Sequence, residues 1–204
     1  MIPNFESFLE ATPDQGVIIV EYYWQPPLAP SRKRGRGDTA NGRKTSMIFF
    51  KRLRATDPCW CGSKRHFGRC HRREDDWTFV TFDSDQQSYS PVILLERTFT
   101  HSDFAGIRES LEANESLLPI ESNGDHATWA IPYQPLIENE IGKLILGTVT
   151  LDKRELLLET NSEHRFDHLT GMLREWLGDS IRAAHTRRAE PQKAFGHGAR
   201  HRRG

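Results

Sequence analysis

Residues 57–73 read Asp-Pro-Cys-Trp-Cys-Gly-Ser-Lys-Arg-His-Phe-Gly-Arg-Cys-His-Arg-Arg and contain every cysteine of the 204-residue chain. The cysteines are Cys59, Cys61 and Cys70, and His71 directly follows the last of them. Thiolate and imidazole are ligands that Zn²⁺ prefers, and four of them satisfy the ion tetrahedrally with no position left for water or substrate. The stretch therefore predicts one structural zinc ion, which holds a segment too short to build a hydrophobic core.

Other uses of these side chains are less consistent with the sequence. Three cysteines cannot all pair as disulfides, and a bridge between Cys59 and Cys61 would be strained. The chain also shows no secretory signal that would place it in an oxidising compartment. A thiol nucleophile is a further alternative, and His66 is a second candidate for the fourth ligand beside His71.

The spacing Cys-x-Cys-x8-Cys-His, with Asp-Pro before it and Gly-Ser after the second cysteine, resembles the SEC-C motif. That motif is named for the C-terminal tail of the bacterial preprotein translocase ATPase. The resemblance implies that the three cysteines and His71 are the zinc ligands, and that Phe67 stands where the family usually has an aromatic residue. Trp60 replaces a usual proline and Lys64 a usual glycine, which alters the loop but removes no ligand.

In known relatives the SEC-C segment is an attached recognition module that docks on partner proteins, such as the translocation chaperone, and on anionic surfaces. The resemblance therefore implies binding and no catalytic activity. Residues 147–151 and 156–165 also resemble stretches in uncharacterised bacterial proteins that carry SEC-C motifs, but this second similarity implies no function.

Basic and aromatic side chains surround the predicted ligands. The candidates for contact with a partner are Trp60, Lys64, Arg65, Phe67, Arg69, Arg72 and Arg73. Rings interleaved with cations are typical of surfaces that stack on bases while they contact phosphate. The same rings could instead pack against adjacent strands. Because Trp60 stands where a proline is usual, its ring is the first to test for contact with a partner.

The charges of the chain are segregated, although the net charge at pH 7 is zero. Residues 32–73 hold fourteen Lys and Arg against two acids, residues 187–204 hold six against one, and the remainder holds eight against twenty-five. An acidic body with two basic segments indicates either contact with nucleic acid or basic segments held against acidic faces of this or another copy. Ordinary solubility is the alternative. With no run of eighteen apolar residues, we expect a cytoplasmic, reduced protein without a membrane span.

Periodicity predicts an α+β fold, in which a mostly antiparallel sheet carries two or three helices and a small inserted zinc knuckle. Strands are expected at residues 17–24, 46–54, 77–82 and 92–99, and hairpins from 117–121 with 127–132 and from 143–151 with 155–160. Helices are expected at residues 4–11, from a Thr100–Asp103 capping box to about Asn114, and from 163 to about 184 behind Ser162.

These elements divide the chain into four expected parts. Residues 1–56 hold the first helix and strands with a basic arm at 25–45, and residues 57–73 form the zinc knuckle. Residues 74–186 form the acidic α+β body, and residues 187–204 form a basic tail. The arm and the tail are rich in glycine and cations and lack apolar periodicity, so we expect both to be disordered.

We interpret the chain as a zinc-binding, non-enzymatic recognition module that docks on a protein partner or on nucleic acid or the ribosome. The alternative is a metal-dependent hydrolase or nuclease with its chemistry in the acidic C-terminal body. Its candidate groups are Glu74, Asp75, Asp76, Asp83 and Asp85, and the helical His164, Asp167 and His168. The sequence shows no phosphate-binding Gly-Lys-Ser/Thr loop, no nucleophile elbow and no dinucleotide fingerprint.

Overall fold

The computed structural model describes residues 16–27, 42–71, 78–83, 88–133, 138–139 and 141–189. The chain divides into two compact units, which we describe separately: unit 1 takes residues 1–20, 48–92 and 189–204, and unit 2 takes residues 21–47 and 93–188. Strands β1 (Gly16–Gln25) and β2 (Arg43–Arg52) contribute residues to both units. The helix expected at residues 4–11 lies outside the described residues.

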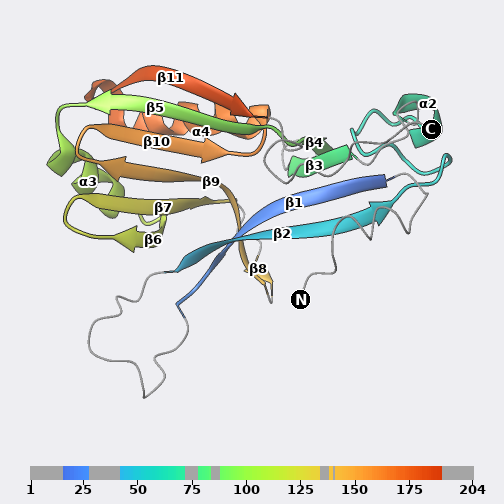
Figure 1. Ribbon diagram of the computed structural model, residues 1–204, viewed down its shortest axis with the longest axis horizontal. Coiled ribbons are helices and arrows are strands. Elements are labelled where there is room, and N and C mark those ends of the chain that lie inside the picture. Colours follow the sequence, from blue (N-terminus) through green and yellow to red (C-terminus); the bar gives the residue numbers. More distant parts are fainter. Residues whose placement is uncertain are drawn as a thin grey trace, which may run out of the picture. The chain divides into compact units, whose positions relative to one another are not determined.

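Unit 2 is built on a sheet in which the strand order is β11-β5-β10-β9-β1, with β7 and β8 also paired to β9 and β6 paired to β7 (Figure 1). Its strands besides β1 and β2 are β5 (Leu94–His101), β6 (Leu118–Ser122), β7 (His126–Pro132), β8 (Glu138–Asn139), β9 (Gly142–Asp152), β10 (Glu155–Thr160) and β11 (Ile181–Ala189). The pairs β6–β7 and β9–β10 are antiparallel, which confirms both predicted hairpins.

Helices α3 (Phe104–Glu112) and α4 (Glu163–Leu177) pack on one face of this sheet (Figure 1). Successive strand residues point to opposite faces, so the apolar residues of β10 alternate with outward-facing ones. Leu156 and Leu158 pair with Leu151 and Val149, and all four are fully buried beneath the helices. The expected docking of the long helix across the second hairpin is therefore confirmed.

The start of α3 differs from the prediction. Thr100 does not cap the helix, because it belongs to β5 and pairs there with Glu155. The cap is Asp103, which accepts a hydrogen bond at Oδ1 from the amide of Gly106 at 2.8 Å. The predicted cap of α4 is confirmed, since Ser162 Oγ accepts from the amide of Arg165 at 3.2 Å.

The end of α4 also corrects the prediction. The helix stops at Leu177, and Gly178 follows with a φ of 52°. A short 3-10 turn, η1 (Gly178–Ser180), then leads into β11. Ile181 fits the helical period, but it is buried as the first residue of a strand whose next seven residues are exposed. The basic tail expected from residue 187 is therefore wrong for 187–189, which lie in β11, and residues 190–204 lie outside the described residues.

Two glycine substitutions test this helix boundary. Gly178→Ala should destabilise the protein by about 1–3 kcal/mol, because an alanine must adopt a positive φ that L residues rarely take. Gly171 lies inside α4, where an added Cβ meets nothing within 4 Å. Gly171→Ala should therefore stabilise it by about 0.5–1 kcal/mol. Denaturant unfolding compares the two, and equal effects would contradict a helix end at Leu177.

Unit 1 is a smaller set of strands that carries the cysteine segment. The first half of β1 pairs in parallel with β3 (Thr78–Asp83), and β3 pairs antiparallel with β4 (Ser88–Pro91). The short helix α2 (Phe67–Cys70) lies between β2 and β3 in the chain. The core of this unit joins strand residues to residues of the knuckle: Val17, Leu53, Cys59, Trp60, Phe67 and Val80. The knuckle is thus not coreless, which corrects the expectation that metal alone replaces a core.

The basic arm expected at residues 25–45 is strand at both ends. Gln25 is the last residue of β1, and β2 begins at Arg43, three residues before the predicted start. Arg43 Nε donates to Gln25 Oε1 at 2.7 Å, and Lys44 Nζ donates to Thr148 Oγ1 at 3.2 Å. Hydrogen bonds to side chains of other strands therefore hold these two cations in the sheet. Residues 28–41 lie outside the described residues.

None of the helices within the described residues is both long and apolar enough to cross a membrane.

Candidate metal centre

The predicted ligands Cys59, Cys61, Cys70 and His71 converge on one point. Their donor atoms all lie within 4.8 Å of one another. Cys61 Sγ lies 3.6 Å from Cys59 Sγ and 3.7 Å from Cys70 Sγ, and His71 Nδ1 lies 3.1 Å from Cys59 Sγ. These four residues are therefore positioned to hold a metal ion, with the Nδ1 atom of His71 as its nitrogen ligand.

The distances suit a tetrahedral ion and exclude a disulfide. Two sulfurs that each lie about 2.3 Å from a tetrahedral zinc are about 3.8 Å apart, and a sulfur and an imidazole nitrogen about 3.5 Å. A disulfide would hold its sulfurs about 2.05 Å apart. The observed separations of 3.6 and 3.7 Å match the tetrahedral edge, and all three cysteines are free thiols.

Backbone hydrogen bonds shape the loop that carries the ligands. The amide of Cys59 donates to the carbonyl of Arg65, and the amide of Phe67 donates to the carbonyl of Asp57, both at 2.8 Å. These bonds flank a β-bridge between Pro58 and His66. Helix α2 begins directly after it, so Cys70 and the following histidine return to the first two cysteines at the end of a single helical turn.

Two residues of the turn adopt a positive φ. Gly62 has a φ of 72°, and a Cβ added there would come within 2.8 Å of Ser88 Cβ. Lys64 has a φ of 60° and is the one non-glycine residue with a positive φ in the described part of the chain. The conformation explains why a glycine is usual at this position of the motif, since glycine adopts it without strain.

The electrostatics of the cluster favour a bound cation. Burial raises the pKa of the Cys59 thiol to about 12, and its neighbours Cys61 and Cys70 contribute to the increase. Burial also raises the pKa of Cys61, but hydrogen bonds with Ser63 and the other two thiols lower that pKa by more. Thiolates this close repel one another, so a divalent cation is needed to hold all three deprotonated together.

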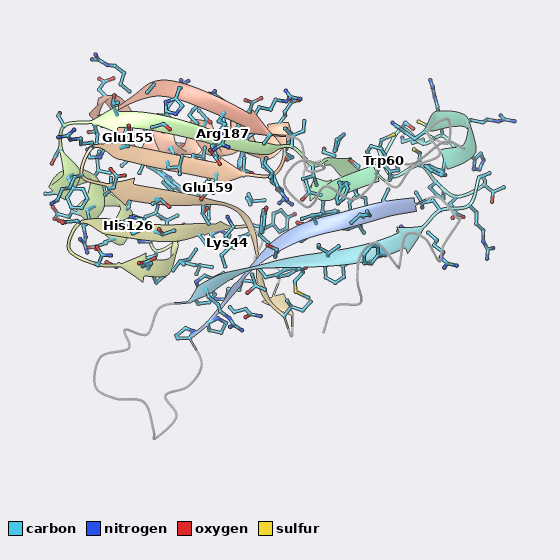
Figure 2. The ribbon with its side chains drawn as sticks, in the orientation of Figure 1. Lys44, Trp60, His126, Glu155, Glu159 and Arg187 are labelled. Carbon is cyan, nitrogen blue, oxygen red and sulfur yellow. The ribbon has the colours of Figure 1, made fainter. Side chains whose placement is uncertain are left out.

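The two aromatic candidates for partner contact lie inside unit 1. The exposed fraction is 8% for Trp60 and 4% for Phe67. The ring of Trp60, which Figure 2 labels, lies 4.5 Å from the His71 ring, measured between centroids, and the Trp60 carbonyl accepts a hydrogen bond from the amide of Tyr89. Trp60 therefore packs beside the ligand histidine and links the knuckle to β4, which is the packing alternative that the sequence left open for these rings.

The cations of the segment are exposed. We call the basic surface the six exposed Lys and Arg side chains of the described residues in unit 1: Lys51, Arg52, Arg54, Lys64, Arg65 and Arg69. Arg72 and Arg73 lie outside the described residues. Within residues 48–71 the one acid is Asp57, whose carboxylate accepts from the amide of Arg54 at 2.7 Å. Cations therefore outnumber acids by six to one within residues 48–71.

His66 is not the fourth ligand in this structure. Its Nδ1 atom lies 2.6 Å from the carbonyl oxygen of Thr56, and the ring is exposed. It lines a shallow depression of about 430 Å³ together with Ala55, Thr56, Gly68 and Arg69. His66 therefore closes the loop by a hydrogen bond and leaves the ligand position to His71.

Within the described residues, the other candidate metal ligands do not form a comparable cluster. His168 and Asp167 are exposed on α4, and within the described residues the cysteine and histidine set is the one group of three or more ligands that could hold an ion. Glu74, Asp75, Asp76 and Asp85 lie outside the described residues, and the side chain of Asp83 is not described.

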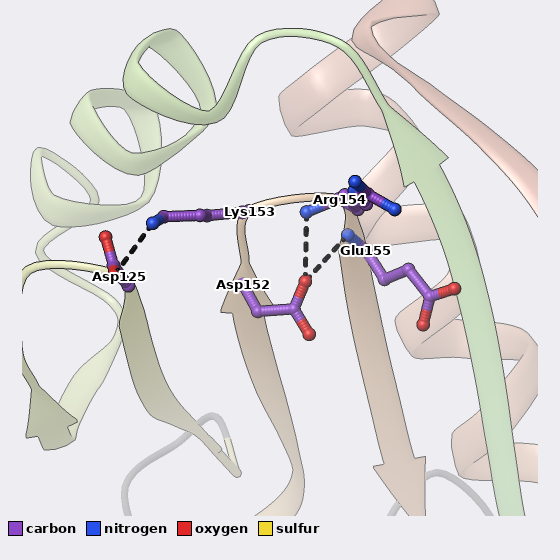
Figure 3. A pocket seen from close by; sticks show the side chains of 5 residues that line it. All are labelled: Asp125, Asp152, Lys153, Arg154 and Glu155. Carbon is purple, nitrogen blue, oxygen red and sulfur yellow. Dashed lines mark hydrogen bonds and ion pairs between the residues drawn. The ribbon is translucent and has the colours of Figure 1, made fainter.

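A shallow pocket of about 390 Å³ lies at the β9–β10 turn and is lined by Asp125, Asp152, Lys153, Arg154 and Glu155 (Figure 3). Asp152 Oδ1 accepts from the amides of Arg154 and Glu155 at 3.0 and 2.9 Å. Lys153 pairs with Asp125 at 2.8 Å, with both side chains largely exposed. These contacts close the turn, and they bring no catalytic constellation together.

Comparison with known proteins agrees with the geometry of the cysteine segment. A protein-family model described as the SEC-C motif matches residues 56–73. Neither the curated proteins nor the solved structures gave a match. The matched residues include all four positioned ligands and the strained Lys64 turn. The chain therefore carries a SEC-C motif, which is a zinc-binding motif, at residues 56–73.

Proposed function

We propose that the SEC-C segment is a structural zinc module that acts without catalysis and docks the chain on an anionic partner, either an acidic protein or nucleic acid. One observation carries the proposal: the four residues positioned to hold an ion lie in the same short segment as exposed cations of the basic surface. Four protein ligands leave a tetrahedral ion no open position for substrate. A bound ion would instead hold the loop in one conformation, and so it would set the positions of the exposed cations that the loop carries.

The conformation of Lys64 supports a role for its charge. A non-glycine residue at a φ of 60° costs about 1 kcal/mol relative to glycine. The side chain is exposed, so packing in the described part of the chain does not offset this cost. Residues held in such a conformation are concentrated at functional sites. We infer that Lys64 contributes its ammonium group to partner binding.

Lys64→Gly separates this role from a structural one. The variant should raise the stability of the zinc-loaded protein by about 1 kcal/mol, because glycine relieves the strain. It should also weaken binding to the anionic partner several-fold, because one exposed cation is lost. Thermal unfolding and a binding titration measure the two effects. Lys153→Ala is the control, since it removes an exposed lysine of unit 2 without changing the basic surface. Higher stability with unchanged affinity would remove Lys64 from the proposed surface.

The decisive experiment is recovery of a partner with the full zinc-loaded chain from extract of its native cell, at low and high salt and with or without nuclease. Loss of the partner after nuclease treatment identifies nucleic acid, and survival identifies a protein. A charge-reversal variant, Arg65→Glu with Arg69→Glu, should lose the partner in either case. A partner retained by that variant would contradict the proposal, as would catalytic turnover that persists in a folded Cys70→Ala protein.

A further inference from the structure

A polar pair of side chains lies on the face of the unit 2 sheet opposite to α3 and α4. Thr148 of β9 and Glu159 of β10 are cross-strand partners. Their strand neighbours Val149 and Leu158 are buried in the core beneath the helices. Because successive strand residues point to opposite faces, Thr148 and Glu159 point away from that core. Thr148 Oγ1 donates a hydrogen bond to Glu159 Oε2 at 3.2 Å, so the hydroxyl hydrogen is directed at the carboxylate.

Lys44 of β2 extends this pair to a chain of three groups. Its Nζ atom donates to Thr148 Oγ1 at 3.2 Å, so an amine, a hydroxyl and a carboxylate are linked in that order (Figure 2 labels Lys44 and Glu159). Lys44 Nζ also lies 4.6 Å from the centroid of the Tyr22 ring. Within the described part of the chain these are its contacts, and no carboxylate pairs with it directly.

The surroundings of Lys44 favour its neutral form. Burial lowers the pKa of the Lys44 ammonium, although the charge of Glu159 opposes this shift. At a given pH a larger fraction of Lys44 is therefore the neutral amine, which carries the lone pair of a nucleophile. Burial also raises the pKa of Tyr22, and Glu159 adds to the increase. The Tyr22 hydroxyl thus stays protonated near neutral pH, and Glu159 is the group of this cluster that can accept a proton.

The order of these groups is that of a nucleophile, a proton relay and a base. An amine that has attacked a carbonyl carbon must lose a proton, and a positioned base makes that loss faster. The hydrogens of Lys44 and Thr148 already point along the path toward Glu159. An ion pair that served stability alone would place the ammonium against the carboxylate, whereas a hydroxyl separates the two here.

We propose that Lys44 is an acyl-acceptor site, whose amine takes an acyl group from an acyl phosphate or a thioester. The Nζ lone pair attacks the carbonyl carbon and forms a C–N bond, and the bond from that carbon to the phosphate oxygen or thioester sulfur breaks. The leaving group departs with the electron pair. The proton lost by the nitrogen passes through the Thr148 hydroxyl to Glu159. None of these residues belongs to the SEC-C segment or the basic surface, so the site is independent of the proposed function.

The test exposes the full zinc-loaded chain to acetyl phosphate and, separately, to acetyl coenzyme A at neutral pH. Peptide mass spectrometry measures the acetylation rate of each lysine. Lys143 is the internal control, since it is also half-buried and its Nζ lies 5.5 Å from the Trp24 ring centroid, but it makes no hydrogen bond within the described residues. Lys44 should react about 100-fold faster than Lys143, the lower end of the range for a positioned base. The more effective donor identifies phosphate or thioester chemistry.

Two variants separate the relay from burial alone. Thr148→Val removes the hydroxyl with little change in volume, and Glu159→Gln removes the base. Because the charge of Glu159 raises the pKa of Lys44, its loss should increase the neutral fraction, and reactivity that came from burial alone would rise. The relay predicts the opposite, a decrease of about 100-fold in both variants. Thr150→Val is the control, since Thr150 Oγ1 lies 3.1 Å from Thr128 Oγ1 on the same face of β9, and it should react like the wild type.

Thermal unfolding of each variant shows whether it is folded, and Glu159→Gln carries the test if Thr148→Val is not. Two results would overturn the inference. In the first, neither donor acetylates Lys44 faster than Lys143. In the second, Glu159→Gln reacts as fast as the wild type or faster, which would leave burial as the sole cause of reactivity. The proposed function would stand in both cases, because it depends on cations of unit 1.

Discussion

Cys70→Ala should lose the bound metal and unfold the SEC-C segment, and a strong chelator should do the same to the wild type. Structural zinc contributes about 10–16 kcal/mol of binding free energy in zinc-finger peptides, and this energy is coupled to folding. Here the ligands lie on a loop held by few backbone bonds, among them those from the amides of Cys59 and Phe67. Metal analysis should find one zinc ion per wild-type chain, and these amides should lose hydrogen-exchange protection when it is removed.

Two variants of the same loop serve as controls for metal loss. Ser63→Ala removes a hydroxyl that lies 3.3 Å from Cys70 Sγ but leaves all four ligands in place. His66→Ala removes the imidazole that contacts the Thr56 carbonyl. Both should retain stoichiometric zinc. If His66→Ala loses the metal and His71→Ala keeps it, the fourth ligand has been assigned to the wrong histidine.

Glu21→Ala should destabilise unit 2 by about 3–5 kcal/mol, because it leaves the guanidinium of Arg165 buried without its carboxylate. Glu21 Oε2 lies 3.0 Å from Arg165 Nη2, and both side chains are no more than 5% exposed. Arg165 Nη1 donates in addition to Asn161 Oδ1 at 2.9 Å. The pair joins β1 to the first turn of α4, so its loss should be visible in the global unfolding transition.

The matched control is the exposed pair of Lys153 with Asp125, whose side chains are 67% and 69% exposed. Asp125→Ala should cost less than about 1 kcal/mol, because water replaces the contact. A double variant, Glu21→Met with Arg165→Met, should recover most of the loss, since it removes both buried charges together. Similar costs for Glu21→Ala and Asp125→Ala in urea unfolding would show that the buried pair does not stabilise the fold.

Local patterns predicted the elements whose partners are close in sequence. The Asn123–Gly124 turn and the apolar runs beside it predicted the β6–β7 hairpin, and the same reasoning found β9 and β10. The capping serine of α4 was equally clear. Such elements depend on turns and on contacts between neighbours in the chain, so sequence reports them well.

Elements that depend on distant partners were placed wrongly or missed. Residues 178–184 were predicted to continue the helix, but residues 178–180 form a 3-10 turn and residues 181–184 begin the edge strand β11, which pairs with β5. Thr100 fitted a capping box, but its pairing with Glu155 keeps it in a strand. In each case pairing between residues far apart in the chain overrides the local preference, and that pairing leaves no periodic signal in the segment itself.

For the buried ion pair, the one indication in the sequence was the isolated acid Glu21. Glu21 interrupts an apolar strand, which marks a charge that needs a partner, but the sequence gives no means to identify Arg165 more than a hundred residues away. The exposure of Phe49 and Phe50 left no signal at all. Their run predicts a strand, and the structure leaves both rings more than a third exposed on β2.

By itself the sequence predicted the four side chains that converge to hold a metal ion, because ligands within fifteen residues of one another are constrained by chain spacing. It also determined the amphipathic faces of the hairpins and helices. The tertiary structure alone decided which aromatic rings are buried and where helix gives way to strand. Burial and strand pairing are properties of the assembled sheet, in which each residue's environment is set by residues far away in the chain.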